Sequence, residues 1–351
     1  MPLYVTDEGQ AVSTHSMLKT FRRCPKQAQY KYIERLKPRL IGTPLKRGSW
    51  MHLLLEEKMK GGDWRKLHKK LCIKFADLLD EERDFYGDLP NECYRLMVSY
   101  EWQYQNDPWK VLETEFTIET EFPDGTLYRG KIDALIENQS GLWLVDHKNN
   151  RRLPDHGFRL RDGQSALYLW AALRNKIPVQ GFIWNYLRTK APTVPKMTLQ
   201  GRLSRAKIDT DYPTYVGELQ RLKKAGELKI TSEHLAKAES LRSQQYKPGQ
   251  PQTSLFFRRD VLEKSGQMLR RVALENHHTS KRMHTYNFGN VDAVERVVET
   301  SCGFSCSYTD LCTVELMGGN PRYIRKNNYT IGDPMDYYED RAGEFPQKGD
   351  E

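Results

Sequence analysis

The chain has 351 residues, of which 38% are hydrophobic and 29% are charged, so it can bury a sizeable core beneath a solvated surface. Its net charge of +9 is typical of proteins that bind polyanions, although a basic enzyme of another kind would also fit. No apolar run approaches the ~20 residues that span a bilayer, and the N-terminal stretch lacks the pattern of a secretion signal. We therefore expect a cytoplasmic protein without membrane contacts.

A single enzyme core with helical insertions is the organisation that this length favours. We expect one domain over residues 1–332, made of an N-terminal helical region (16–110), an α/β core (111–190) and a C-terminal helical region (212–312) with a cysteine cluster. Residues 333–351 are rich in acids, and we expect this tail to be disordered.

The N-terminal region predicts helices. Residues 16–36 are typical of two short helices separated at Cys24, because the proline that follows fits a first helical turn. Residues 47–60 predict a helix that begins near Gly48 and carries His52 in its first turns. A single histidine there is more often a surface or core residue than a ligand.

Residues 109–120 alternate in the manner of a β-strand. The apolar face is predicted to hold Leu112, Thr114, Phe116 and Ile118. Two glutamates, Glu113 and Glu115, fall on the opposite face, and either one could be an ordinary strand charge.

The most informative stretch is 127–150, which predicts two strands joined by a turn at residues 138–141. On the first strand, Ile132 and Ala134 are expected on one face and Asp133 on the other.

On the second strand Asp146 and Lys148 must share a face, while His147 points away. Two carboxylates and an amine then converge. Carboxylate oxygens suit Mg²⁺ or Mn²⁺, and a nearby lysine can assist a metal-bound water or stabilise a phosphorane-like transition state.

The alternative is that Asp146 and Lys148 form an ordinary surface ion pair. Residues 142–145 are too apolar for a strand that is open to water on both faces, so the charged pair is expected to end a buried strand.

Residues 162–175 have the period of a buried helix, on which Gln164 and Tyr168 share a face. These two are more often packing residues, but beside a phosphodiester site they become candidates for positioning the substrate. Residues 179–189 predict another strand.

The rest of the chain predicts mostly helices, over residues 212–239 and 256–276, with a polar loop at 244–253 between them. The class is therefore α/β, with a central sheet of mixed order flanked by helices.

Six cysteines occur, and four of them are candidates for a metal centre: Cys24, Cys302, Cys306 and Cys312. They can meet only if the two ends of the fold are adjacent. Four thiolates suit either a four-iron four-sulfur cluster or structural zinc, and spacing alone does not separate the two. Cys72 and Cys93 are better explained as buried core thiols.

Six motifs occur in an order that resembles the RecB-like branch of the PD-(D/E)XK nucleases, especially its iron–sulfur members. They are SMLKTFRRCP, RGSWMHLLLE, GKID, LVDHK, GQSALY and CGFSCSYTDLC. CRISPR-associated RecB-like exonucleases, AddB nuclease domains and phage-encoded exonucleases belong to this group. The resemblance implies a restriction-endonuclease-like core with an iron–sulfur staple that joins the N- and C-terminal regions.

The resemblance also implies roles for individual residues. The implied Mg²⁺ or Mn²⁺ ligands are His52, Glu115, Asp133, Asp146 and the main-chain carbonyl of His147, with Glu113 as the competing choice for the first acid. Lys148 matches the catalytic lysine. The QxxxY pair, Gln164 and Tyr168, matches substrate-positioning residues, and the four clustered cysteines match iron–sulfur ligands.

The expected function is therefore a metal-dependent DNA nuclease that acts as an exonuclease on single strands or duplex ends, in phage recombination or replication inside a bacterial host. CRISPR adaptation and a noncatalytic DNA-binding accessory role are the alternatives. A helicase, recombinase or single-strand-binding protein would be a fitting partner, and a homo-oligomer is compatible with the family.

Overall fold

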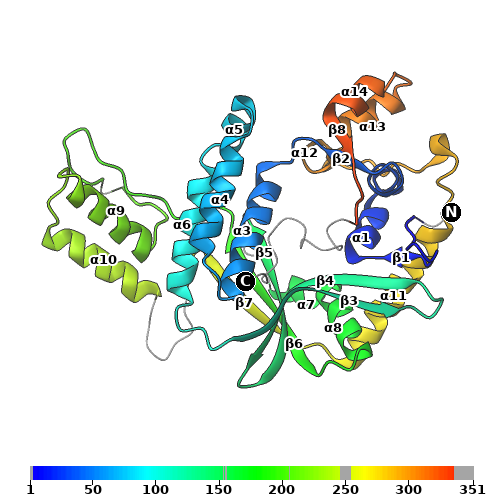
Figure 1. Cartoon of the computed structure of the whole chain (residues 1–351), viewed down its shortest axis with the longest axis horizontal. Helices are drawn as coiled ribbons and strands as arrows, with labels where there is room; N and C mark the ends of the chain where they lie inside the picture. The colour runs from blue at the N-terminus through cyan, green and yellow to red at the C-terminus, as the bar shows by residue number, and fades with distance from the viewer. Residues whose placement is uncertain (1–2, 153, 155, 205, 246–253, 336–351) are drawn as a thin grey trace, which may run out of the picture.

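A six-stranded mixed sheet forms the centre of the computed structural model, which describes residues 3–152, 154, 156–204, 206–245 and 254–335. The strand order is β1-β4-β5-β6-β7, and β3 pairs with β4 along nearly the whole length of β4 (Figure 1). The strands are β1 (Val12–Ser13), β3 (Lys110–Glu121), β4 (Leu127–Asn138), β5 (Gly141–Asn150), β6 (Val179–Arg188) and β7 (Phe257–Leu262). Both parallel and antiparallel pairs occur, so the predicted α/β class with a mixed sheet is confirmed.

Helices cover both faces of the sheet (Figure 1). One face packs against α1 (His15–Arg23), α8 (Gly163–Arg174) and α11 (Gly266–Thr285), in a core that includes Leu144 and Phe182. On the other side lie α3 (Thr43–Met59), α4 (Trp64–Ala76), α5 (Asp80–Tyr86) and α6 (Leu89–Gln103). The core of the molecule therefore has two layers of side chains, separated by the sheet.

The two ends of the described chain meet in a small separate unit. Strand β2 (Leu36–Pro38) pairs antiparallel with β8 (Tyr329–Ile331). Around this pair lie α2 (Pro25–Ala28), a π-helix (Gln29–Ile33), α12 (Cys302–Ser305), α13 (Thr309–Leu316) and α14 (Arg322–Asn328). Tyr308 packs in a buried cluster here, and its hydroxyl donates to the carbonyl of Leu36 at 2.8 Å. The unit therefore places the N- and C-terminal cysteines near one another.

Several predicted elements have different bounds. The predicted helix at 256–276 is wrong in its first part, because residues 257–262 form β7 along the free edge of β6, and α11 begins only at Gly266, after the Ser265 cap. Helix α3 begins at Thr43 rather than near Gly48, with Pro44 in its first turn.

Two further differences concern connections. The single helical segment predicted at 212–239 is two helices, α9 (Tyr212–Lys224) and α10 (Ser232–Gln245), because Gly226 adopts a positive φ after the first helix. The predicted loop at 244–253 lies almost wholly outside the described residues, as does the predicted acidic tail from residue 336 onward. A short helix, α7 (His156–Leu160), precedes α8.

The expected face of Leu112 is also wrong. The register between β3 and β4 shifts between Val111 and Glu113, and Leu112 is exposed instead of packing beside Phe116 and Ile118. A bulge of this kind turns the strand and changes which side chains face the core. Within the described chain, no helix is both long and apolar enough to cross a membrane.

Candidate active site

A nitrogen of His52 and carboxylate oxygens of Glu115 and Asp133 lie within 4.8 Å of one another. They come from three elements, α3, β3 and β4, so only the tertiary structure can assemble them. One imidazole and two carboxylates are a ligand set that hard divalent ions accept. The chemistry of these donors therefore fits a Mg²⁺ or Mn²⁺ ion.

Glu115 reaches this position through an unusual backbone conformation. Its φ is +52°, in the left-handed region that residues other than glycine seldom adopt. Its carboxylate is nearly buried and lies 3.5 Å from the amine of Lys131. Glu113, the competing candidate in the sequence, is exposed on the same strand. The structure thus brings Glu115, and not Glu113, to His52 and Asp133.

A pair of variants follows from this difference. Glu115→Gln removes a charged ligand and should lower metal-dependent cleavage by at least about a hundredfold, while Glu113→Gln should leave it within about twofold. The measurement is the cleavage rate as a function of Mn²⁺ concentration. Equal losses in the two variants would contradict the assignment of Glu115.

Asp133 is held by groups on both sides of its carboxylate. Oδ2 lies 3.3 Å from Nδ1 of His52 and accepts a 2.6 Å hydrogen bond from the backbone N–H of His147. Burial alone would raise the pKa of Asp133, but the neighbouring His52 imidazole holds that pKa well below its usual value. For His52, burial would lower the pKa of the imidazole, but the Asp133 carboxylate outweighs burial and raises it. Asp133 is therefore a permanent carboxylate at neutral pH.

Strict alternation along β4 stops at Asp133. Ile132 packs in the core beneath α8, whereas Ala134 packs in the cluster beneath α3. The expectation that both would face one side is therefore wrong. The break lies opposite the left-handed Glu115 on β3, so the two carboxylates meet where both strands are irregular.

Asp146 and Lys148 form a second group beside the first. Lys148 Nζ lies 2.5 Å from Asp146 Oδ2, and it lies 5.2 Å from the centre of the Trp184 ring. Burial raises the pKa of Asp146 to about 7, although the lysine opposes this shift. Burial would lower the pKa of Lys148, but Asp146 and Asp133 raise it. The structure thus brings together His52, Glu115, Asp133, Asp146 and Lys148. Asp146 is not part of the compact trio, because its carboxylate faces the amine of Lys148.

Gln164 connects Asp146 to the QxxxY helix. Its Nε2 donates to Asp146 Oδ1 at 3.0 Å and to the hydroxyl of Tyr168 at 3.1 Å. Asp162 caps α8 by accepting from the backbone N–H of Gln164, which fixes the first turn of the helix. The glutamine thus determines which way the carboxylate of Asp146 faces.

Gly130 explains how Tyr168 can approach the sheet. A Cβ on this glycine would lie 2.7 Å from a ring carbon of Tyr168, closer than atoms can pack. We expect Gly130→Ala to displace the ring, disturb the Gln164 hydrogen bonds and lower cleavage by roughly tenfold. Kinetics should be combined with thermal unfolding. Gly181→Ala is the control, because its Cβ would meet the backbone of Leu262 three residues along β6 from the partner of Asp146, and it should lower stability rather than cleavage. Unaltered cleavage by Gly130→Ala would show that Tyr168 has no positioning role.

His147 points away from Asp146 and Lys148, toward α3, where its ring lies 5.9 Å from the ring of His52. Its Nδ1 lies 2.7 Å from Nδ2 of Asn185 and its Nε2 lies 3.3 Å from the sulfur of Met59. Burial lowers the pKa of the imidazole to about 3, so the ring is neutral. The side chain therefore supports the sheet from the helical side, and only its main chain is turned toward Asp133.

Lys131 is a site residue that the sequence analysis missed. Its amine is buried and pairs with Glu115. The sequence contained a signal for this residue, because Lys131 precedes Asp133 by two residues. The same two-residue spacing predicts that Asp146 and Lys148 share a strand face.

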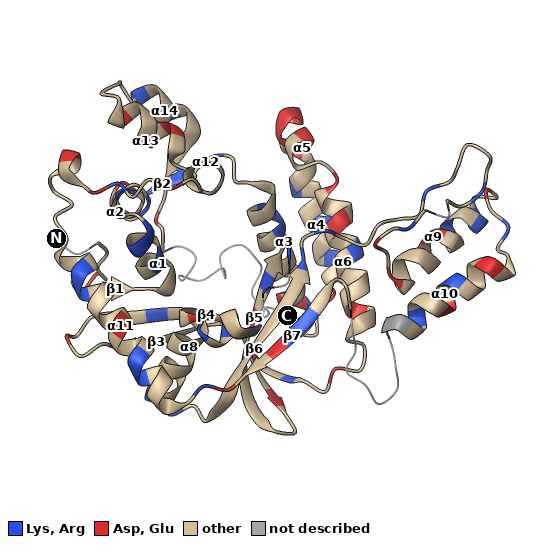
Figure 2. Cartoon of the chain, turned by 180° about the vertical axis from the view of Figure 1, so that it is seen from behind, with Lys and Arg blue, Asp and Glu red and all other residues tan. Residues whose placement is uncertain are grey.

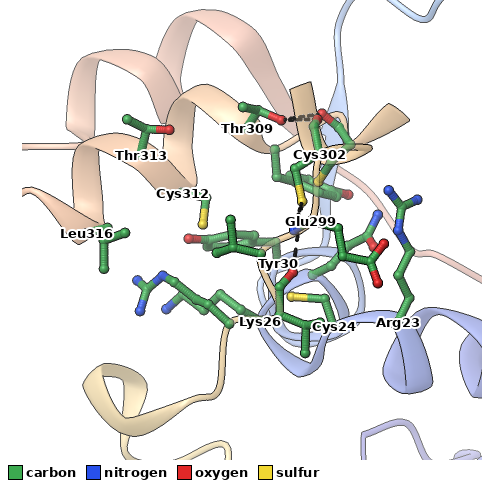
Figure 3. A pocket seen from close by; sticks show the side chains of 16 residues that line it. Arg23, Cys24, Lys26, Tyr30, Glu299, Cys302, Thr309, Cys312, Thr313 and Leu316 are labelled. Carbon is green, nitrogen blue, oxygen red and sulfur yellow. Dashed lines mark hydrogen bonds between the residues drawn. The ribbon is translucent and has the colours of Figure 1, made fainter. Parts of the chain in front are cut away.

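A separate pocket of about 170 Å³ is lined by all four clustered cysteines: Cys24, Cys302, Cys306 and Cys312. Figure 3 shows Cys24 on one side of the pocket and Cys302 and Cys312 on the other. All four are free thiols. The ends of the chain thus meet in a site rich in sulfur, some way from the carboxylates.

The pocket has features that suit anionic sulfur. The backbone N–H of Glu299 donates to Sγ of Cys302 at 3.4 Å, and the guanidinium of Arg296 bonds to Cys312. Arg23 and Lys26 also line the pocket. No three of the four described sulfurs lie within 4.8 Å of one another. A tetrahedral zinc site with Zn–S bonds of about 2.3 Å would require sulfurs at roughly 3.8 Å.

Cys72 and Cys93 lie elsewhere, in the core of the α3–α6 helices. Cys93 is fully buried, and Cys72 is half-buried with its sulfur 3.5 Å from His68. Neither lines the sulfur pocket.

The chain was compared with curated sequences and with solved structures. No curated protein sequence matches the chain. Among solved structures, a candidate exonuclease from Eubacterium rectale is similar at 11% identity and a TM-score of 0.37, over 84% of this chain and 92% of that one. The protein SSO0001 is similar at 15% identity and a TM-score of 0.25, over 59% and 70% of the two chains.

The family comparison is more decisive. Residues 13–313 match the model of the PD-(D/E)XK nuclease superfamily. This range begins within β1 and extends through the last of the clustered cysteines, so it contains the other five strands of the sheet and both groups of site residues. The chain therefore belongs to the PD-(D/E)XK nuclease superfamily.

Proposed function

We propose that the chain is a Mg²⁺- or Mn²⁺-dependent deoxyribonuclease. The observation that carries this proposal is the compact trio of His52, Glu115 and Asp133 beside the Asp146–Lys148 pair. A divalent ion bound there supplies a Lewis acid for the scissile phosphate and lowers the pKa of a water. Asp146 supplies a further carboxylate at the edge of the trio, and the main-chain carbonyl of His147 is the remaining candidate ligand.

Lys148 has the role of placing positive charge beside the phosphate that is attacked. Its Nζ lies over the Trp184 ring, 5.2 Å from the ring centre, which limits the positions of the amine. It can stabilise the charge that develops on the phosphoryl oxygens and assist the attacking water. Gln164 and Tyr168 orient Asp146 and the substrate backbone, because Gln164 donates to this carboxylate and also to the hydroxyl of Tyr168.

The sulfur pocket is proposed to hold a 4Fe–4S cluster rather than zinc. The separation of the sulfurs, the nearby cations and the backbone donor at Cys302 all favour a larger anionic group. Its role would be structural, since it would connect Cys24 to a segment almost the whole chain away.

We propose exonuclease action on single strands or duplex ends, in phage recombination or replication in a bacterial cytoplasm; CRISPR adaptation is the alternative setting. A noncatalytic accessory protein is the rival class, but inactive members would have little need for the complete set of carboxylates and lysine found here. A helicase, a recombinase, a single-strand-binding protein or a second copy of the chain would be the partner to look for.

The test is a cleavage assay on labelled linear, circular and single-stranded DNA, with Mg²⁺, Mn²⁺ or EDTA. We expect metal-dependent degradation of linear and single-stranded DNA and little loss of circular duplex. Efficient cutting of circles would instead show endonuclease action. Purified protein that leaves all three substrates intact with either metal would refute the proposed activity.

A further inference from the structure

A basic arm leaves the sheet directly beside the catalytic strand. In the parallel pair β5–β6, Lys148 lies opposite Tyr186 and Asn150 lies opposite Arg188. The next residue, Thr189, donates its backbone N–H to the carbonyl of Asn150 at 3.0 Å. The arm therefore begins within two residues of the level of Lys148, at the edge where the site residues end β5.

This arm contains basic residues and no acidic ones. Residues 189–208 contain no Asp or Glu, but they contain five basic residues: Lys190, Lys196, Arg202, Arg205 and Lys207. Lys190 and Arg188 share Asp209 as an ion-pair partner. Lys196, Arg202 and Lys207 are exposed and form no ion pair with any described residue. Figure 2 shows basic residues, coloured blue, recurring on this segment and on the α9–α10 pair that follows.

The middle of the arm is an ordered β-hairpin. Met197 bridges to Leu203, the Ser204 N–H donates to the Lys196 carbonyl at 2.8 Å, and the Thr198 N–H donates to the Arg202 carbonyl at 2.7 Å. These hydrogen bonds join main-chain groups, and the Thr198 hydroxyl accepts one more from the Arg202 N–H at 3.3 Å, so the hairpin does not depend on the side chains of Leu199 or Arg202.

Leu199 is the first residue of that tip and is fully exposed, at 109% of the reference area. Gly201 completes the tight turn with a φ of +70°. A single exposed leucine on a protein surface is ordinary. This leucine lies at the tip of a hydrogen-bonded hairpin, between two cations that form no ion pair with any described residue, on an arm that leaves β6 beside the site residues. It has the chemistry of a wedge that enters a base step while the cations hold phosphates.

The arm is anchored on a small helical unit. Helices α9 and α10 pack around their own cluster, which includes Leu203 from the hairpin. Tyr212 packs against Trp102 of α6 with ring centres 5.3 Å apart, and the buried Asp211 caps α9. The hairpin is thus connected to the nuclease core at both of its ends, which a strand-separating element requires.

We propose that the 196–204 hairpin binds DNA at a junction of duplex and single strand, with Leu199 inserted at the first base pairs and Lys196 and Arg202 on the flanking phosphates. The inference rests on the proposed function only in taking DNA as the polymer. From Thr189 the ten residues to Leu199 span at most about 35 Å. The wedge would therefore contact the duplex within roughly ten base pairs of the scissile bond.

The experiment measures binding without cleavage, in EDTA, on duplexes with a single-stranded overhang that carry 2-aminopurine at successive positions near the junction. We expect the wild-type protein to increase the fluorescence at one or two of these positions, and Leu199→Ser to abolish the increase while its affinity for single-stranded DNA stays within about twofold. Lys196→Gln/Arg202→Gln should lower junction affinity about tenfold and reduce the salt dependence by about two released ions.

Matched control variants distinguish a specific effect of the hairpin from the effect of changing any exposed leucine or lysine. Leu235→Ser changes another exposed leucine, on α10, and Lys69→Gln/Lys70→Gln removes two exposed cations on α4; neither should alter the fluorescence. If wild-type protein gives no fluorescence change, or if Leu199→Ser retains it, the wedge is refuted. Failure of the metal-dependent cleavage assay would refute the proposed activity instead, and this binding result would be unaffected by it.

Discussion

Lys148→Met is expected to lower the single-turnover cleavage rate by about 10²- to 10⁴-fold, the range typical of a group that acts on charge or protons in the transition state. Methionine keeps an apolar side chain of similar length but removes the ammonium that lies 5.2 Å from the centre of the Trp184 ring, so the change removes the charge and its contact with the ring. DNA affinity in EDTA and the thermal unfolding midpoint should stay close to those of the wild type. Single-turnover kinetics at saturating Mn²⁺ provide the measurement.

Two further variants sharpen this test. Lys110→Met, which removes an exposed lysine on β3 that pairs with Glu137, should leave the rate unchanged. Combining Lys148→Met with Asp146→Asn should cost little more than the worse single change, because the two side chains form one unit at 2.5 Å. Near-normal turnover by Lys148→Met would show that the amine is merely an ion-pair partner of Asp146.

Cys312→Ser is expected to abolish the visible charge-transfer absorption of anaerobically purified protein, together with its bound iron and sulfide. The loss of a ligand that connects the two ends of the chain should also lower the free energy of unfolding by roughly 2–5 kcal/mol, as removal of a native cross-link does. Cys72→Ser, outside the pocket, should retain the absorption. Wild-type protein that contains zinc and lacks this absorption would refute the cluster.

The fold should nevertheless survive in Cys312→Ser, because other contacts join the same ends. Glu315 bonds to the hydroxyl of Tyr30 at 2.6 Å and pairs with Lys26 at 3.2 Å, and β2 pairs with β8. Residual cleavage by the variant can therefore be measured. A loss of iron with cleavage retained would establish that the cluster stabilises the fold and takes no part in the reaction.

Much of the core could be predicted because it depends on local patterns. The β4–β5 hairpin follows from two apolar strand segments joined by a short turn, and the shared face of Asp146 and Lys148 follows from the two-residue period of a strand. The break between α1 and α2 at Cys24 follows in the same way from Pro25. Patterns of this range need no knowledge of distant segments.

The errors occur where distant partners determine local structure. Residues 257–262 pair with β6 across an insertion of some seventy residues, and nothing within the segment itself indicates that free edge. The exposure of Leu112 likewise depends on a register shift against β4.

The sequence by itself determined the class of the protein, its motifs and the types of side chain available for chemistry, since these depend on residue identity and short spacing. Only the tertiary structure decided that Glu115 and not Glu113 joins His52 and Asp133, because that choice requires a left-handed residue opposite a break in the next strand. Only it could bring Cys24 to Cys302, since proximity across the whole chain results from packing and not from any pattern within either segment.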